Sequence, residues 1–244
     1  MKTFQDVYGR ELMGFYRNEN QMEVIERSDG LIDARGLGGK NYYFSEYKDW
    51  ATFEKTAMKF VKGRVLDIAC GAGRHSLYLQ KKGLKVLGID NFPLVIQVCR
   101  LRGLKRAIVL AIEEMSRLKA SSFDTLLMMG NNFGLFGSFS KAKRFLRKMR
   151  LITSPGAVII AQTLDPHQTN NPLHLKYHQL NRKRGRMVGQ ARIRVRYQNL
   201  IGPWMDYLLV SVKEMRKILQ GTGWAVKKVI PSKSSVYIAV IERL

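Results

Sequence analysis

Residues 65–73 constrain the fold of this chain more than any other segment, because they join a buried strand to a helix through a glycine-rich turn. The segment reads Val-Leu-Asp-Ile-Ala-Cys-Gly-Ala-Gly, so an apolar strand ends just before two glycines. Gly71 and Gly73 let the backbone approach a ligand where a Cβ atom would intrude. The amides at the start of the following helix can hold a carboxylate or a phosphate. The segment therefore predicts an α/β unit that binds a ligand.

Strands and helices alternate through the chain that follows this turn. The expected strands are residues 65–69, 85–89, 107–112, 123–129, 157–162, 224–230 and 236–241. The expected helices are residues 73–82, 93–102, 141–152 and, after a capping-box signature at Ser211–Glu214, 212–220. Such alternation is typical of a parallel sheet covered by helices. The sequence thus predicts an α/β fold with a Rossmann-like, mostly parallel seven-stranded sheet and helices on both faces.

Two segments interrupt this pattern and suggest additions to the core. Residues 1–62 are expected to form an N-terminal cap, with a hairpin between 23–27 and 31–35 and a helix over 49–62. Residues 166–205 contain no Asp or Glu and are interpreted as a basic insertion or lid. Within this insertion, the alternation of basic and apolar residues over 192–197 predicts a strand. The expected organisation is therefore a core at 63–165, completed by residues 206–244.

The glycine-rich turn resembles the first motif of class I S-adenosylmethionine-dependent methyltransferases, which commonly reads Asp-x-x-Cys/Gly-Gly-x-Gly. The resemblance covers about Arg64 to Leu244, nearly three-quarters of the chain. Asp90 closes the second strand, where this family places an acidic residue on the ribose hydroxyls. Nicotinamide enzymes also have an acid there, but their turn carries a third glycine. Here Gly73 is followed by Arg-His-Ser, which favours the methyltransferases.

The resemblance implies that the cofactor is S-adenosylmethionine and indicates which residues hold it. It places the methionine part of the cofactor against Asp67 and the glycines, and the ribose on Asp90. Where the family often has an Asp beside the adenine, this chain has Ile112, with Glu113 next. The expected cofactor residues are Asp67, Ala69, Gly71, Gly73, Asp90, Asn91, Ile112, Glu113, Gly130 and Asn131.

Candidate residues for the acceptor side follow the fourth and fifth strands. Asn131 leaves the fourth strand at the carboxyl edge, where open α/β sheets bind ligands, although it equally fits a role in satisfying loop amides. Asp165 and His167 come directly after the fifth strand and are the candidate general bases. A base is needed only if the acceptor must lose a proton before methyl transfer. Cys70 and Cys99 match no metal-binding spacing, so no metal is expected.

The net charge of +23 is the unusual feature of the composition, since it favours polyanionic partners. Three functions remain open. The preferred one is an enzyme that methylates a small-molecule acceptor by in-line displacement. The second is a methyltransferase of tRNA or rRNA that uses the basic insertion, although no appended RNA-binding module is recognisable. The third is a non-catalytic protein that binds S-adenosylmethionine.

The sequence also bears on the compartment of the protein. No apolar run approaches the roughly 20 residues that cross a bilayer, and the first ten residues lack the apolar centre of a signal peptide. Two cysteines without a disulfide pattern fit a reduced compartment. We therefore expect a cytoplasmic protein with no membrane partner, while the sequence does not indicate an oligomeric state.

Overall fold

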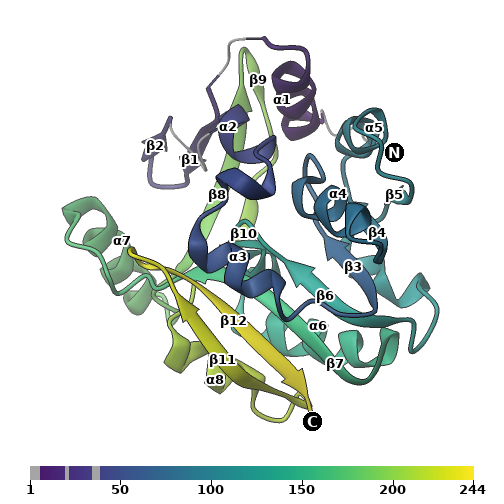
Figure 1. Cartoon of the computed structure of the whole chain (residues 1–244). Coiled ribbons are helices and arrows are strands. Elements are labelled where there is room, and N and C mark those ends of the chain that lie inside the picture. The colour runs from purple at the N-terminus through teal and green to yellow at the C-terminus, as the bar shows by residue number, and fades with distance from the viewer. Residues whose placement is uncertain (1–5, 20–21, 35–38) are drawn as a thin grey trace. The chain divides into compact units, whose positions relative to one another are not determined.

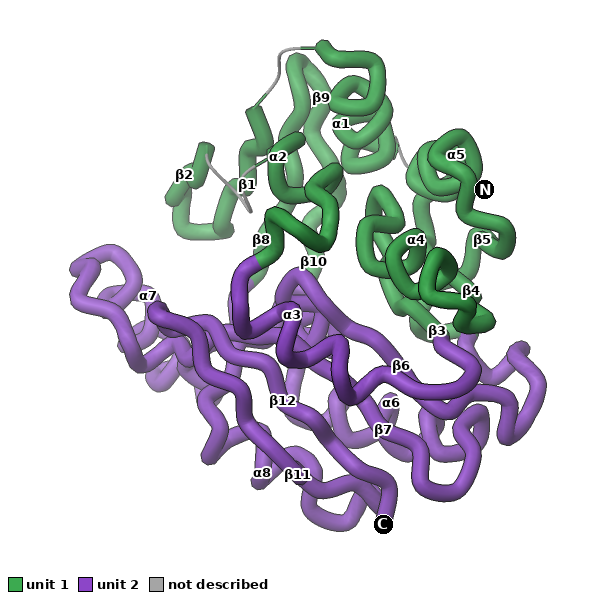
Figure 2. The backbone as a smooth tube through the Cα atoms, in the orientation of Figure 1, with its two compact units in different colours: residues 1–50, 66–114, 192–205 green, residues 51–65, 115–191, 206–244 purple. Residues whose placement is uncertain are grey.

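The computed structural model describes residues 6–19, 22–34 and 39–244. The chain forms two compact units (Figure 2). Unit 1 consists of residues 1–50, 66–114 and 192–205, and unit 2 consists of residues 51–65, 115–191 and 206–244. The glycine-rich turn and Asp90 belong to unit 1, whereas Gly130 and Asp165 belong to unit 2.

The larger sheet has seven strands in the order β11-β12-β7-β6-β3-β4-β5 (Figure 1). These strands are β3 (Arg64–Ile68), β4 (Lys85–Asp90), β5 (Ala107–Val109), β6 (Phe123–Met128), β7 (Thr153–Leu164), β11 (Trp224–Pro231) and β12 (Val236–Arg243). The pairs β4–β5 and β6–β7 are parallel, whereas β12 runs antiparallel to both β7 and β11. The predicted Rossmann-like, mostly parallel seven-stranded sheet is confirmed.

The helices are distributed over both units. In unit 1 they are α1 (Val7–Tyr16), α2 (Gly39–Tyr43), η1 (Tyr47–Asp49), α4 (Arg74–Lys81) and α5 (Pro93–Leu101), followed by η2 (Ile112–Arg117), which extends into unit 2. In unit 2 they are α3 (Thr52–Met58), η3 (Asn132–Phe136), α6 (Phe139–Ile152), α7 (Pro172–Lys183) and α8 (Val212–Leu219). α4 and α5 contact β4, α6 contacts β7, and α3 and α8 contact β11. The four predicted helices are thus confirmed as α4, α5, α6 and α8.

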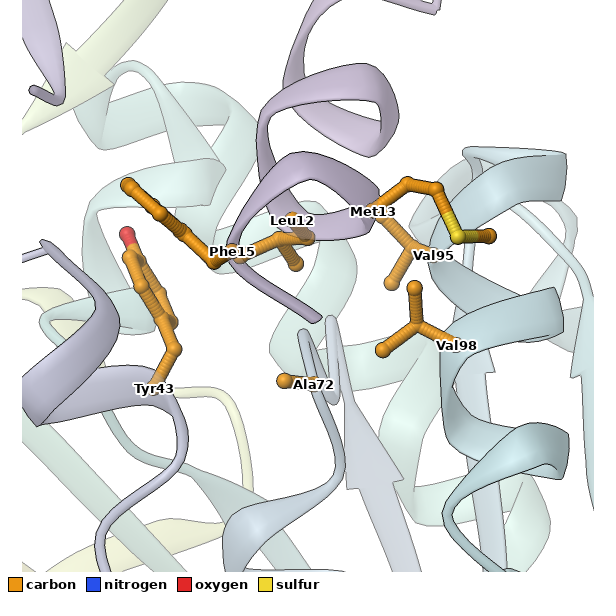
Figure 3. Close-up of a cluster of buried hydrophobic side chains, with 7 residues drawn as sticks. All are labelled: Leu12, Met13, Phe15, Tyr43, Ala72, Val95 and Val98. Atoms are coloured by element: carbon orange, nitrogen blue, oxygen red, sulfur yellow. The ribbon is translucent and has the colours of Figure 1, made fainter. Parts of the chain in front are cut away.

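The N-terminal segment is part of the hydrophobic core of unit 1. α1 packs on α5, and its apolar side chains face Ala72 of the glycine-rich turn (Figure 3). The buried cluster consists of Leu12, Met13, Phe15, Tyr43, Ala72, Val95 and Val98. Full burial of a large apolar side chain contributes about 1.5–3 kcal/mol to the free energy of folding, so this cluster stabilises the packing of α1 against the turn.

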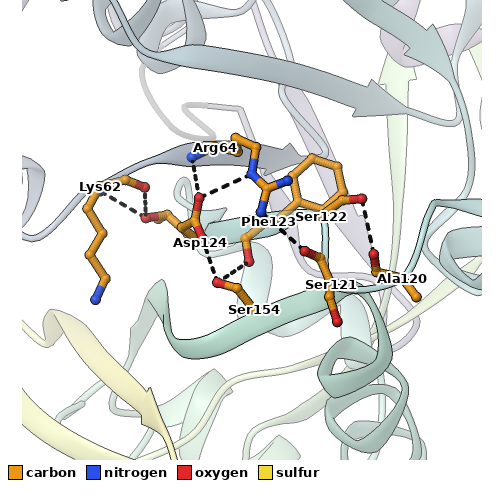
Figure 4. A network of polar contacts seen from close by, with 9 residues as sticks. Lys62, Arg64, Ala120, Ser121, Ser122, Phe123, Asp124 and Ser154 are labelled. Carbon is orange, nitrogen blue, oxygen red and sulfur yellow. Dashed lines mark hydrogen bonds and ion pairs between the residues drawn. The ribbon is translucent and has the colours of Figure 1, made fainter.

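A polar network in unit 2 fixes where β6 begins (Figure 4). The Asp124 carboxylate accepts hydrogen bonds from the Arg64 amide at 2.8 Å and from the Ser154 hydroxyl at 2.5 Å. The Thr125 hydroxyl accepts a hydrogen bond from the Lys62 amide and donates one to the Lys62 carbonyl. These bonds connect the start of β6 to the segments that begin β3 and β7.

A second, smaller sheet has the strand order β10-β8-β1-β2, with β9 paired to β8. Its strands are β1 (Val24–Arg27), β2 (Ile32–Asp33), β8 (Gln190–Tyr197), β9 (Leu200–Ile201) and β10 (Met205–Leu208). The predicted hairpin is confirmed as β1 and β2, with Arg35 outside the described residues, and the predicted basic strand is confirmed as β8. The antiparallel pairing of β1 with β8, which joins the cap to the insertion, was not predicted.

Several element boundaries differ from the sequence predictions. The predicted third strand is wrong at its end, because β5 stops at Val109 and Ile112 starts a 3₁₀ turn. The expected helix over 49–62 is shorter, since α3 covers only Thr52–Met58. α7 lies within the insertion, where no helix was predicted. None of the helices in the described parts of the chain has both the length and the apolar character required to cross a bilayer.

Candidate functional site

The turn between β3 and α4 has left-handed backbone at three positions. Ala69, Gly71 and Gly73 all have positive φ angles, of 55°, 53° and 76°. A Cβ atom on Gly71 would lie 3.4 Å from the Tyr8 hydroxyl oxygen and 3.9 Å from a Tyr43 ring carbon. Left-handed backbone is readily adopted by glycine, and because Gly71 has no side chain, no Cβ atom lies between its main chain and these tyrosines. A side chain at position 71 would occupy the space between the turn and the two tyrosines.

Asp90 lies beside this turn, as the sequence predicted. Its carboxylate accepts hydrogen bonds from the Gly71 amide at 3.3 Å and from the Phe92 amide at 3.2 Å. The side chain is almost completely buried, and this burial raises the pKa of Asp90 to about 7. Asn91, the next residue, is exposed. The structure therefore brings the glycine turn and the predicted ribose-binding acid together within unit 1.

Asp67 has its partners on the other side of the turn, in the first turn of α4. The Ser76 hydroxyl donates a hydrogen bond of 2.7 Å to the Asp67 carboxylate. Burial raises the pKa of Asp67 to about 7, and the hydrogen bonds from Ser76 oppose that rise. Asp67 thus ties the end of β3 to the start of α4, and a direct contact of Asp67 with the cofactor stays a prediction.

Ile112 and Glu113 lie in η2 rather than at the end of a strand. Ile112 is half-buried and the Glu113 side chain is exposed. Because β5 ends at Val109, residues 110–111 separate the strand from this turn, and the spacing assumed for the adenine side does not hold. The proposed adenine contacts of Ile112 and Glu113 stay predictions.

Gly130 and Asn131 follow β6 in unit 2, and both have positive φ angles. The Gly130 amide donates a hydrogen bond to the Gln162 side chain at 3.1 Å, and the Tyr207 hydroxyl donates one to the Asn131 carbonyl at 2.6 Å. The side-chain oxygen of Asn131 is buried and has no hydrogen-bond partner among the described residues. A buried acceptor of this kind is suited to a ligand N–H or O–H group.

Asp165 and His167 lie just beyond the carboxyl end of β7. The Asp165 carboxylate accepts a hydrogen bond from the backbone amide of His167 at 2.9 Å. The imidazole of His167 instead lies 3.4 Å from a carboxylate oxygen of Glu214, which also caps α8. The two predicted bases are therefore neighbours whose side chains have separate partners, and their catalytic role stays a prediction.

Known methyltransferases resemble this chain in sequence and in fold. Residues 66–161 match the family model of a methyltransferase domain. A solved structure of a SAM-dependent methyltransferase from Bacteroides fragilis, in complex with S-adenosyl-L-homocysteine, is 25% identical to this chain. It aligns with 98% of this chain and 95% of its own, with a TM-score of 0.82. Residues 66–161 therefore form a methyltransferase domain, and almost the whole chain is similar to a SAM-dependent methyltransferase.

Two curated relatives cover shorter parts of this methyltransferase chain. A ubiquinone biosynthesis O-methyltransferase from Hahella chejuensis is 37% identical over 71 residues, which is 27% of this chain and 30% of the relative. Another, from Xanthomonas euvesicatoria pv. vesicatoria, is 25% identical over 118 residues, 46% of this chain and 48% of the relative. The chain thus spans less than half the length of these curated relatives.

The basic strand of the insertion is largely engaged within the methyltransferase itself. In the β1–β8 pair, Glu26 lies directly opposite Arg194. The Glu26 carboxylate is contacted by Arg194 at 2.7 Å and by Arg196 at 2.5 Å. Arg192, on the same strand, is exposed. Two of the three arginines predicted to form a basic face therefore hold the small sheet together.

The sequence reasoning missed the residues that α1 and α2 contribute beside the turn. Tyr8, Glu11 and Tyr43 are the important ones, and all three belong to unit 1. A signal was present, because Glu11 sits one residue before Leu12 and four before Phe15, within the apolar stripe of α1. An acidic residue in such a stripe is a departure from the usual amphipathic pattern and marks a site to inspect.

Proposed function

We propose that this protein is an enzyme that transfers a methyl group from S-adenosylmethionine to a small-molecule acceptor by in-line displacement. The observation that carries the proposal is the contact between the glycine turn and Asp90, in which the Gly71 amide donates a hydrogen bond to a buried carboxylate. The complex of the Bacteroides fragilis relative with S-adenosyl-L-homocysteine supports a cofactor of this type.

The residues of unit 1 fit the parts of this cofactor. Asp90 would accept hydrogen bonds from the ribose hydroxyls, and these donors would favour its ionised form. The open backbone at Gly71 and the first amides of α4 would hold the methionine carboxylate. When bound, S-adenosylmethionine supplies a methyl group already activated on a sulfonium. The protein's part is then to align donor and acceptor and to exclude water.

Asp165 and His167 are the proposed bases for an acceptor that must lose a proton. The Glu214 carboxylate lies 3.4 Å from the His167 imidazole and would orient the ring. Glu214 is itself held by the Ser211 amide and hydroxyl, both at 2.8 Å. This arrangement gives His167 an oriented carboxylate partner.

A small molecule is the proposed acceptor because both curated relatives are named as ubiquinone biosynthesis O-methyltransferases. The RNA alternative is weakened by the partners of the basic residues. Arg194 and Arg196 bind Glu26, so they are less available to phosphates. On α6, Lys143 and Arg147 donate hydrogen bonds to the carbonyls of Gln220 and Gly221.

Two measurements test the proposal. Titration calorimetry is expected to give a micromolar dissociation constant for S-adenosylmethionine, about −8 kcal/mol. Incubation of a fractionated cell extract with tritiated S-adenosylmethionine should place the label in small molecules. Label in RNA would support the alternative acceptor, and binding without any transfer would support a non-catalytic protein.

A further inference from the structure

A pair of buried glutamates in unit 1 is not used by the proposed chemistry. Glu11, on α1, is completely buried, and Glu23, just before β1, is 3% exposed. The Tyr43 hydroxyl donates a hydrogen bond of 2.6 Å to Glu23. In contrast, neither carboxylate oxygen of Glu11 has a hydrogen-bond partner among the described residues. The described residues therefore bury a carboxyl group without giving it a hydrogen bond.

This arrangement is costly, since a buried carboxylate needs hydrogen bonds or a counter-charge. Burial, followed by the charge of Glu23, raises the pKa of Glu11 to about 9. Among the described residues, no cation acts on Glu11 to oppose that rise, although the full sequence has 42 Lys and Arg residues against 19 Asp and Glu. A cationic ligand would supply the missing partner.

The glutamate pair lies close to the glycine turn. Tyr8, one helical turn before Glu11 on α1, has its hydroxyl 3.4 Å from the position of a Gly71 Cβ. Besides burial, the charges of Asp90, Glu23 and Glu11 all raise the pKa of Tyr8, so these acids surround it. The Tyr8 and Tyr43 rings meet edge to face, with centroids 5.9 Å apart. In Figure 3, Tyr43 lies on the same side of the turn as Phe15 of α1.

We propose that Glu11 and Glu23, with the rings of Tyr8 and Tyr43, bind an amine cation carried by the methyl acceptor. Carboxylates beside aromatic faces are the chemistry that recognises ammonium groups. The inference rests on the proposed methyltransferase function and adds the class of acceptor to it. An acceptor of this class carries at least one basic nitrogen, whichever of its atoms receives the methyl group.

The ammonium of S-adenosylmethionine is the other source of a cation. That ammonium shares its carbon with a carboxylate, whose negative charge would oppose ionisation of Glu11. An amine on the acceptor brings no such negative charge. The acceptor is therefore the better match to a site with two acids.

The test uses the full chain, tritiated S-adenosylmethionine and the small-molecule fraction of a cell extract. Labelled products are separated on a cation exchanger at acidic pH, which retains amines. Wild-type protein is compared with Glu11→Gln and with the control Glu46→Gln, which makes the same change at a side chain 75% exposed in unit 1. We expect retained label, at least tenfold slower labelling at limiting extract for Glu11→Gln, and no change for Glu46→Gln.

Other results would overturn the inference. Label confined to neutral or anionic small molecules would refute it while leaving the proposed function intact. A tenfold loss of cofactor affinity in Glu11→Gln, measured by calorimetry, would assign the glutamates to the cofactor instead. Absence of label from all small molecules would remove the proposed function and this inference together. The wild-type elution result decides the matter even if Glu11→Gln does not fold.

Discussion

Asp90 and Glu11 are both almost completely buried in unit 1, but the described residues donate hydrogen bonds to only one of their two carboxyl groups. Asp90 accepts two backbone hydrogen bonds, from Gly71 and Phe92, whereas Glu11 accepts none from the described residues. Burial raises the pKa of both groups, to about 7 for Asp90 and about 9 for Glu11. Asp90 is therefore bonded to the backbone of the glycine-rich turn, whereas Glu11 has no hydrogen-bond donor among the described residues.

The largest expected effect comes from adding a side chain to the glycine turn beside which Asp90 lies. Gly71→Val should abolish binding of S-adenosylmethionine, because its side chain would project towards the Tyr8 hydroxyl. The matched control is Gly83→Val, since Gly83 also has a positive φ but its Cβ would meet nothing within 4 Å. Calorimetry should show normal affinity for the control. Equal losses in both variants would mean that backbone strain, and not a blocked site, is responsible.

Removal of the partnered acid should have the next largest effect. Asp90→Ala is expected to weaken cofactor binding by about 1.5–3 kcal/mol, the usual range for hydrogen bonds to a charged group. Glu11→Gln, measured in the same titration, should change cofactor affinity by less than about 0.5 kcal/mol. An unchanged affinity in Asp90→Ala would contradict the role of Asp90 on the ribose.

The hydrogen bond to Asp67 provides a test on stability rather than binding. Ser76→Ala removes the 2.7 Å bond to a carboxyl group that is 2% exposed. The Ser76 amide still donates to Asp67 in this variant, so only one hydrogen bond is lost, and the free energy of unfolding in urea should fall by about 0.5–1.5 kcal/mol. Ser140→Ala, at a hydroxyl on α6 whose contact with the Ser138 hydroxyl is exposed, is the control and should have little effect.

The structural features that could be predicted from the sequence are those that depend on residues close together along the chain. The turn at Gly71, the acid at Asp90 and the capping box at Ser211 are local patterns, and each lies where it was predicted. The pairing of β1 with β8 joins residues about 170 positions apart, and no local pattern encodes such a contact. α7 was missed because Leu173 and Leu175 are exposed, so its apolar residues do not form a regular stripe.

The candidate site was predictable only in part for a related reason. The residues of the turn belong to one continuous motif, which is recognisable in a single chain. The proposed role of Glu11 depends on Glu23, Tyr43 and Tyr8. These residues are apart in the sequence and come close together only after folding. A helical wheel places Glu11 on the buried face of α1, but it does not reveal whether a partner is present there.

The smallest expected effect concerns the stability that Glu11 contributes at different pH values. The pKa of Glu11 rises from 4.5 to about 9 on folding, so between these values the folded chain binds more protons than the unfolded chain. The free energy of unfolding must then decrease as the pH rises through this window. Glu11→Gln does not titrate, so its stability relative to wild type should increase from pH 5 to pH 8.

The size of that increase is limited by local opening of α1, which would let the carboxyl group ionise before the whole chain unfolds. One group contributes at most about 1.4 kcal/mol per pH unit, and we expect a total gain on the order of 1 kcal/mol. Asp67 and Asp90 have pKa values raised in the same direction, but they are present in both proteins and cancel in the difference. Urea unfolding at pH 5 and pH 8 measures this difference directly. A variant that became less stable than wild type at pH 8 would show that Glu11 is satisfied within the chain, and the contrast with Asp90 would disappear.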